Sequence, residues 1–231
     1  MFDRKKYKKF ALIQLNKRWT IPVVITFISG LIVSLVEFPD ILTSIKLISR
    51  GNEELTAAST IYSEIRSIIV CFICYVLAYA QTHVYLKMSR GPEPVSLGDF
   101  FEGFTKWGRS ILAGIWQNLW ETLWSLLFII PGIVKHYSYC MTRFIVMEYP
   151  EIPVTKALRI SKVITYGHRM DIFIMELSFL GWSLLCLLTC GIGFFWLTPY
   201  MQLSLTNAYH SILTEAIETG KLKKEDLAGE K

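Results

Sequence analysis

Charged residues are scarce in this sequence, and no catalytic motif stands among them. Asp, Glu, Lys and Arg make up 19% of the 231 residues, whereas about a quarter is usual for a soluble globular domain. The chain has no G-x-S-x-G, no H-E-x-x-H and no glycine-rich loop ending in Lys-Ser or Lys-Thr, the motifs of serine hydrolases, zinc peptidases and P-loop nucleotidases. We therefore expect no enzymatic activity.

Histidine and cysteine are also few, and their spacing favours neither a metal site nor a redox pair. The four histidines and five cysteines do not follow the spacing of metal ligands. Cys71 and Cys74 have C-x-x-C spacing, but they lie in an apolar segment, where a thiol is poorly placed to ionise. We expect these cysteines to pack in a core, and we expect no metal and no other cofactor.

Long apolar runs take the place of the missing charge. The four clearest cover residues 19–38, 65–86, 110–130 and 172–188, and two weaker runs cover 133–147 and 192–213. Each of the four is near the ~20 residues that cross a ~30 Å hydrocarbon layer. The pattern predicts an all-α, polytopic membrane bundle of six transmembrane helices.

Positive charge gathers in four segments between these runs. Residues 1–18, 87–109, 149–169 and those after 213 contain seven, four, four and four Lys or Arg. The positive-inside rule places such segments in the cytoplasm. Six spans with both termini cytoplasmic satisfy this distribution. A five-span alternative, in which residues 133–147 are re-entrant, would place one basic cluster outside the cell.

Three short amphipathic segments precede the predicted hairpins. Residues 1–18 place Tyr7, Phe10, Ala11 and Leu15 at helical spacing among basic side chains, a pattern typical of a helix that lies on anionic lipid headgroups. A capping-box pattern at Ser96 predicts a second helix, and a third is predicted at residues 153–164. We expect the second and third helices in the cytoplasm.

An internal repeat links the later segments. Trp124-Ser-Leu-Leu recurs as Trp182-Ser-Leu-Leu, and Gly132-Ile133 recurs as Gly191-Ile192. We expect three helix-plus-hairpin units in a single membrane domain over residues 1–231, with 1–90 as the first unit, 96–213 as the other two and 214–231 as a charged cytoplasmic tail. Such repeats occur in transporters, but duplication also produces purely structural bundles.

The second hairpin is predicted to turn at Pro131-Gly132, where proline removes a backbone donor and glycine eases the turn. The spans contain no G-x-x-x-G, so the sequence gives no sign of a close glycine-mediated helix crossing.

Polar side chains recur at helical spacing inside the last four predicted spans. A charge in hydrocarbon usually faces the bundle interior and marks a functional site by default. We expect these side chains to line one polar interior and to bind a ligand there: Gln117, Glu121, Lys135, Tyr139, Arg143, Glu176, Gln202 and His210. Arg143 and Glu176 have similar predicted depth and are expected to pair. Lys135 is expected near the outer face. For Glu121 the expected hydrogen-bond partner is Gln117, Asn118, Tyr139 or a water.

Several motifs occur together in the C-terminal two-thirds of the chain. They are Leu123-Trp124-Ser-Leu-Leu, Ile130-Pro131-Gly132-Ile133-Val134-Lys135, Tyr137-Ser138-Tyr139-x-Met141, Ala157 with Ser161, Leu177-Ser-Phe-Leu-Gly181-Trp182, Gly191-Ile-Gly193 and Pro199-Tyr200. On these residues, positions 96–212 resemble a bacterial family of integral membrane proteins catalogued as domain of unknown function nine-seven-five. The resemblance implies a multi-span protein of the bacterial inner membrane and supplies no activity. A looser similarity to the membrane domain of glycerophosphodiester phosphodiesterases implies lipid-related work.

Two functions fit these observations. The first is binding or transport of a small amphiphile or lipid through the polar interior between the third and sixth spans. The alternative is a non-transporting assembly, scaffold or regulatory protein that contacts a membrane-protein partner through its amphipathic helices, with Phe100, Phe101 and Phe104 at the contact. Under either hypothesis we expect membrane lipids as partners and no nucleic acid.

Overall fold

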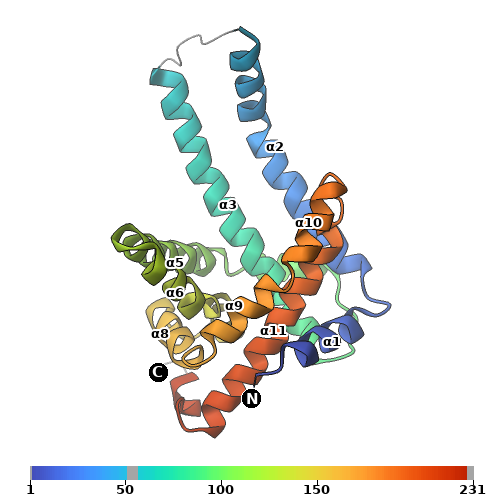
Figure 1. The fold of residues 1–231 in the computed structure, drawn as a ribbon, viewed down its shortest axis with the longest axis vertical. Helices are drawn as coiled ribbons and strands as arrows, with labels where there is room; N and C mark the ends of the chain where they lie inside the picture. The colour runs from blue at the N-terminus through green and yellow to red at the C-terminus, as the bar shows by residue number, and fades with distance from the viewer. Residues whose placement is uncertain (1, 51–56, 228–231) are drawn as a thin grey trace.

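The computed structural model describes residues 2–50 and 57–227, which form helices joined by short turns (Figure 1). In chain order the helices are α1 (Arg4–Leu15), α2 (Thr20–Arg50), α3 (Ala57–Arg90), α4 (Leu97–Phe104), α5 (Trp107–Leu127), α6 (Ile129–Tyr139), α7 (Thr142–Glu148), α8 (Val154–Ile164), α9 (Arg169–Leu177), α10 (Leu180–Leu188), α11 (Phe194–Glu218) and the 3₁₀ turn η1 (Lys224–Leu227). The prediction of an all-α fold is confirmed for this part of the chain.

Three helical stretches are long and apolar enough to cross a membrane. They are Thr20–Pro39, Ile61–Arg90 and Arg169–Leu188, with mean hydropathies of 2.2, 1.8 and 1.8. Large apolar side chains on them face outward, including Leu35, which is 65% exposed, and Leu188, which is 81% exposed. An exposed apolar surface of this kind is unfavourable in water, whereas lipid acyl chains solvate it. The fold is therefore that of a membrane protein.

Helices α3 and α11 hold the bundle together. The lower half of α3 in Figure 1 contacts α2, α4, α5, α7 and α11, and α11 also contacts α1, α2, α8 and α10. The upper halves of α2 and α3 extend away from the other helices (Figure 1). The buried core accordingly lies around the lower half of α3, where Tyr85 and Phe144 are each 1% exposed.

The turn between α5 and α6 differs from the sequence prediction. The helix break falls at Phe128, whose extended backbone (φ −160°, ψ 144°) separates the two helices. Pro131 and Gly132 lie inside the first turns of α6, and proline is tolerated there because the first backbone N–H groups of a helix have no intrahelical acceptor. The predicted turn at Pro131-Gly132 is thus wrong by three residues.

Gly132 instead permits a close approach between α5 and α6. A Cβ atom added at Gly132 would lie 2.9 Å from the Cα of Ser125 and still closer to the Ser125 hydroxyl. A close glycine-mediated approach therefore occurs without a G-x-x-x-G motif. A single glycine opposite a serine is sufficient, because the small residue and its partner stand on different helices.

We expect Gly132→Ala to be about 1–3 kcal/mol less stable than the matched variant Gly181→Ala, because overpacking against backbone atoms shifts the helices. Gly181 lies in α10, and a Cβ atom there meets nothing within 4 Å, so alanine should be tolerated. Unfolding in mixed micelles of rising SDS content measures both variants. Equal stabilities would contradict the close contact.

The predicted capping box at the start of α4 is present. The backbone N–H of Ser96 donates to Asp99 Oδ2 at 2.7 Å, and Lys87 of α3 pairs with the same carboxylate. Burial alone would raise the pKa of Asp99, but the hydrogen bonds from Lys87 and from the Ser96 backbone hold that pKa below its ordinary value. These contacts fix α4 across the end of α3.

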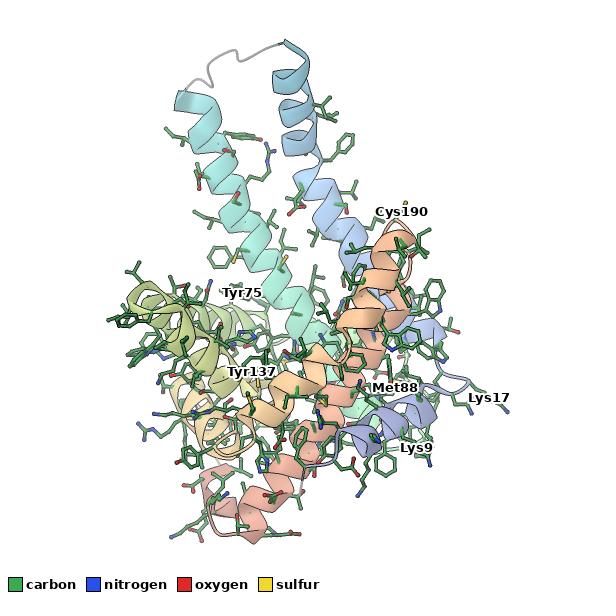
Figure 2. All side chains as sticks on the ribbon, viewed as in Figure 1. Lys9, Lys17, Tyr75, Met88, Tyr137 and Cys190 are labelled. Carbon is green, nitrogen blue, oxygen red and sulfur yellow. The ribbon has the colours of Figure 1, made fainter. Side chains whose placement is uncertain are left out.

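The N-terminal helix packs on protein along the face that was expected to meet lipid. Tyr7, Ala11 and Leu15 are buried, and the Tyr7 hydroxyl donates to Ser211 Oγ of α11 at 2.8 Å. Of the predicted apolar stripe, Phe10 alone stays exposed, at 44%. The basic side chains around it remain at the surface, as Figure 2 shows for Lys9 and Lys17. Contact of these side chains with anionic headgroups remains a prediction.

Candidate functional site

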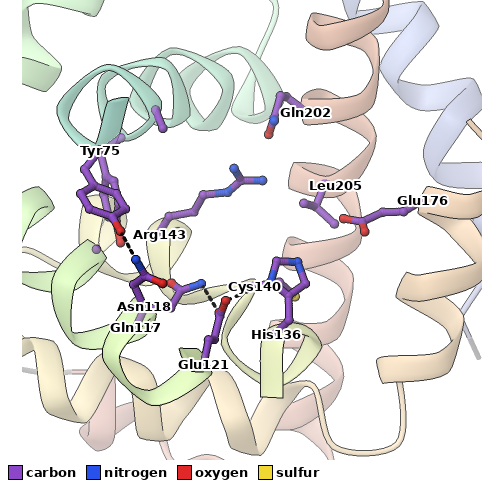
Figure 3. A pocket seen from close by; sticks show the side chains of 13 residues that line it. Tyr75, Gln117, Asn118, Glu121, His136, Cys140, Arg143, Glu176, Gln202 and Leu205 are labelled. Atoms are coloured by element: carbon purple, nitrogen blue, oxygen red, sulfur yellow. Dashed lines mark hydrogen bonds and ion pairs between the residues drawn. The ribbon is translucent and has the colours of Figure 1, made fainter. Parts of the chain in front are cut away.

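A cavity of about 420 Å³ lies where six helices converge (Figure 3). It is lined by Tyr75, Ala78 and Tyr79 of α3, Gly114, Gln117, Asn118 and Glu121 of α5, His136 of α6, Cys140, Arg143 of α7, Glu176 of α9, and Gln202 and Leu205 of α11. Two carboxylates, a guanidinium and an imidazole therefore share one space in the apolar part of the fold.

Glu121 is held by two neighbours. Gln117, one helical turn earlier on α5, donates from Nε2 to Glu121 Oε1 at 2.8 Å. Nδ1 of His136 lies 3.1 Å from the other carboxylate oxygen. The Glu121 side chain is 20% exposed and that of His136 is 52% exposed, so this pair lies at the mouth of the cavity.

Glu176 accepts a hydrogen bond from the Tyr137 hydroxyl at 2.9 Å. The Tyr137 ring meets Phe173 edge to face at 5.6 Å, so α6 and α9 position this carboxylate together. The expected ion pair between Glu176 and Arg143 does not form in the described part of the chain. In the view of Figure 3, Leu205 stands between the two side chains.

Arg143 is the unusual member of the site. Its side chain reaches into the cavity (Figure 3), and its Nε is buried with no hydrogen-bond partner. Its guanidinium carbon lies 5.0 Å from the centroid of the Phe144 ring. A guanidinium carries five N–H donors in a planar fork, so among the described residues this group has unused capacity for an anionic oxygen.

The structure brings five of the eight predicted site residues together: Gln117, Glu121, Arg143, Glu176 and Gln202 line the cavity. The other three lie elsewhere. Lys135 Nζ is 4.4 Å from the Trp124 ring centroid, Tyr139 is 8% exposed in the hydrophobic core, and His210 Nε2 lies 2.8 Å from Ser89 Oγ. Lys135 lies within electrostatic range of Lys162 and Arg169.

Several lining residues were missed by the sequence reasoning. His136, Cys140 and Arg143 share one face of α6–α7 at offsets of four and seven, and this spacing was the signal for His136. Tyr75 and Tyr79 show the same four-residue spacing in α3. Asn118 Nδ2 donates to the Tyr75 hydroxyl at 3.0 Å, and Gly114 leaves room for that ring, because a Cβ atom there would lie 2.5 Å from it.

In residues 2–50 and 57–227, the structure gathers no group of three or more His, Cys, Asp or Glu side chains that would hold an ion. The cavity's donors and acceptors are instead suited to organic ammonium, phosphate or carboxylate groups.

Comparison with curated proteins and with solved structures gave no match. A comparison with protein families gave a match over residues 128–216. This range contains His136, Arg143, Glu176 and Gln202 of the cavity, but it begins after Glu121. The range is shorter than the 96–212 expected from the motifs. Residues 128–216 match the family described as protein of unknown function (DUF975), which confirms the family resemblance for this part of the chain.

Proposed function

We propose that this membrane protein binds, in the cavity, the polar head of a small amphiphile that carries both a cationic and an anionic group. The observation that carries the proposal is the guanidinium of Arg143, whose buried Nε has no hydrogen-bond partner among the described residues and which shares the cavity with two carboxylates. Arg143 would take the anionic oxygen in a two-pronged contact. Glu121 and Glu176 would take the ammonium group, and Tyr75 would border the carbon atoms between them.

Charge balance supports a zwitterionic ligand. An isolated charge in a low-dielectric site is strongly disfavoured unless it is paired. A ligand with one charge of each sign satisfies Arg143 and a carboxylate at the same time, and it enters without a net charge. A purely anionic ligand would meet both glutamates at close range, and a purely cationic one would meet Arg143.

The membrane topology belongs to the same proposal: six spans, both termini in the cytoplasm of a bacterial cell, and three units of a short helix followed by a hairpin. The element order supports it, since α1 precedes α2 and α3, α4 precedes α5 and the pair α6–α7, and α8 precedes the pair α9–α10 and α11. The tip of the α5–α6 hairpin is apolar and open, with Leu126 85% and Ile129 77% exposed. Cys190 marks the tip of the α10–α11 turn (Figure 2).

The test measures Tm of the purified full-length chain in a neutral detergent with three single-chain amphiphiles of equal acyl length. We expect lysophosphatidylethanolamine, which carries ammonium and phosphate, to raise Tm more than lysophosphatidic acid or an alkylamine, because a ligand selective for the folded state stabilises it. Glu121→Gln should remove the preference for the zwitterion over lysophosphatidic acid. Glu102→Gln, on the exposed side of α4, is the matched control and should keep it. Equal shifts with all three amphiphiles, or none, would refute the proposal.

The alternative of an assembly or regulatory protein loses part of its expected contact surface. Phe100 is 1% exposed and packs edge to face with Phe104 at 5.0 Å. Phe101 is 63% exposed, so part of the apolar side of α4 is directed into this chain and part of it stays open to a partner. The apolar side of α8 is buried as well, including Ala157 and Leu158. Serine at Phe100 would disturb the fold itself and could not report on a partner.

A further inference from the structure

A second polar site lies apart from the cavity, at the corner between α8 and α9. A depression of about 460 Å³ is lined there by Arg159 and Lys162 of α8, Val163, Tyr166, Arg169 at the start of α9, and Lys221 from the segment after α11. We call these four cations and Tyr166 the basic corner. None of them lines the cavity that holds Arg143.

The cations of the basic corner outnumber the acids around them in the described part of the chain. None of its four cations forms an ion pair there, and the buried Nε of Arg169 has no hydrogen-bond partner. Three acids near the corner have other partners. Asp171 and Glu215 face His168 at 3.8 and 3.1 Å. Asp226 lines the adjoining depression with Arg159 and Lys221, and it accepts a hydrogen bond from the backbone N–H of Lys223 at 3.2 Å. Like charges at short range repel, so this cluster is unfavourable unless an anion joins it.

The surroundings of the basic corner indicate where that anion comes from. Arg169 is the first residue of the candidate span Arg169–Leu188. Tyr166 is 69% exposed and Met170 is 66% exposed, and the Arg169 guanidinium lies 5.7 Å from the Tyr166 ring centroid. Aromatic and basic side chains at the end of a span are typical of the membrane–water interface, where the phosphates of lipid headgroups lie.

We propose that the basic corner binds a phosphate group, supplied by an anionic lipid headgroup of the adjoining leaflet. Arg159 and Arg169 offer planar forks that match phosphate oxygens, and Lys162 and Lys221 add point charges. Lys221 lies in the segment after α11, so a phosphate bound at the basic corner would also hold this segment against α8. This inference is independent of the amphiphile proposed for the cavity.

The test uses the full chain in a neutral detergent and follows Tm during titration with dihexanoyl phosphatidylglycerol, dihexanoyl phosphatidylcholine and glycerol 3-phosphate. The variant is Arg159→Gln with Lys162→Gln, since both side chains are exposed. The matched control is Lys223→Gln with Lys224→Gln, which removes the same charge from exposed positions outside the depression. We expect phosphatidylglycerol to bind the variant roughly 30-fold more weakly than the control, from the loss of two basic contacts.

Each outcome bears on the proposal. Stabilisation by phosphatidylglycerol but not by glycerol 3-phosphate supports a lipid phosphate, and equal stabilisation by both supports the phosphate site with a soluble ligand. Without any anion, the variant should be as stable as the control or more so, because repulsion is relieved. A variant that responds to phosphatidylglycerol like the control overturns the proposal, and so does a variant that is less stable than the control without anion.

Discussion

Replacing Glu148 with alanine is expected to lower the free energy of unfolding by about 2–4 kcal/mol. The carboxylate joins three helices, because it ends α7, accepts from Arg90 of α3 at 2.5 Å and accepts from the Tyr209 hydroxyl of α11. Tyr209 is fully buried and stacks on Phe144 at 5.1 Å. Alanine leaves its hydroxyl buried without an acceptor, which accounts for most of the loss. Arg90 contributes less, since its side chain is 56% exposed.

Unfolding in mixed SDS micelles measures this effect, with Glu218→Ala as the control, an exposed residue at the end of α11. Tyr209→Phe closes a double-mutant cycle. We expect the losses for Glu148→Ala and Tyr209→Phe to be strongly non-additive, because both remove the same hydrogen bond. Additive losses, or a loss for Glu148→Ala no larger than that of the control, would show that the carboxylate does not join the helices.

The helices themselves could be predicted from the sequence because apolar runs and charge clusters report directly on them. The breaks could not be placed as well. The Pro131-Gly132 pair looked like a turn, yet the extended residue is Phe128, and nothing in the composition around Phe128 distinguishes it. The stripe on α1 was recognised, but an apolar face has the same pattern whether it packs on lipid or on α11.

The candidate site was predicted in part, and the errors have a common cause. Successive residues of a helix are about 100° apart around its axis, so choosing Lys135 in place of His136 rotates the predicted face by that angle. The predicted pairing of Arg143 with Glu176 assumed that equal depth brings side chains together. In the structure Glu176 accepts a hydrogen bond from Tyr137 instead. The distance of a residue along its span predicts its depth, but it does not predict which neighbouring helix the side chain faces.

Glu148 was missed for a different reason. Its partners Arg90 and Tyr209 are 58 and 61 residues away in the sequence, and the residue lies just beyond the apolar run 133–147. Contacts between residues so far apart in the sequence depend on how the helices pack, and local sequence periodicity does not predict them.

Arg143→Met is expected to separate stability from binding. The guanidinium has no hydrogen-bond partner in the described part of the chain, and the cavity carboxylates keep their own donors, His136 and Gln117 for Glu121 and Tyr137 for Glu176. Methionine should therefore change the stability of the ligand-free protein by less than about 1 kcal/mol, whereas breaking a buried ion pair would lose about 3–5 kcal/mol.

The same substitution should weaken binding of lysophosphatidylethanolamine by about 10- to 100-fold, the range for losing a charged hydrogen-bonded contact. Arg143→Lys serves as the matched variant, because it keeps the charge and loses the planar fork, and its affinity should fall between the two. Tm with and without the amphiphile gives both quantities for each variant. If Arg143→Met unfolds far more easily while its response to the amphiphile is intact, the guanidinium holds helices together and does not receive the ligand. If stability is retained and the response is lost, the unused donors of Arg143 are the anion-binding part of the cavity.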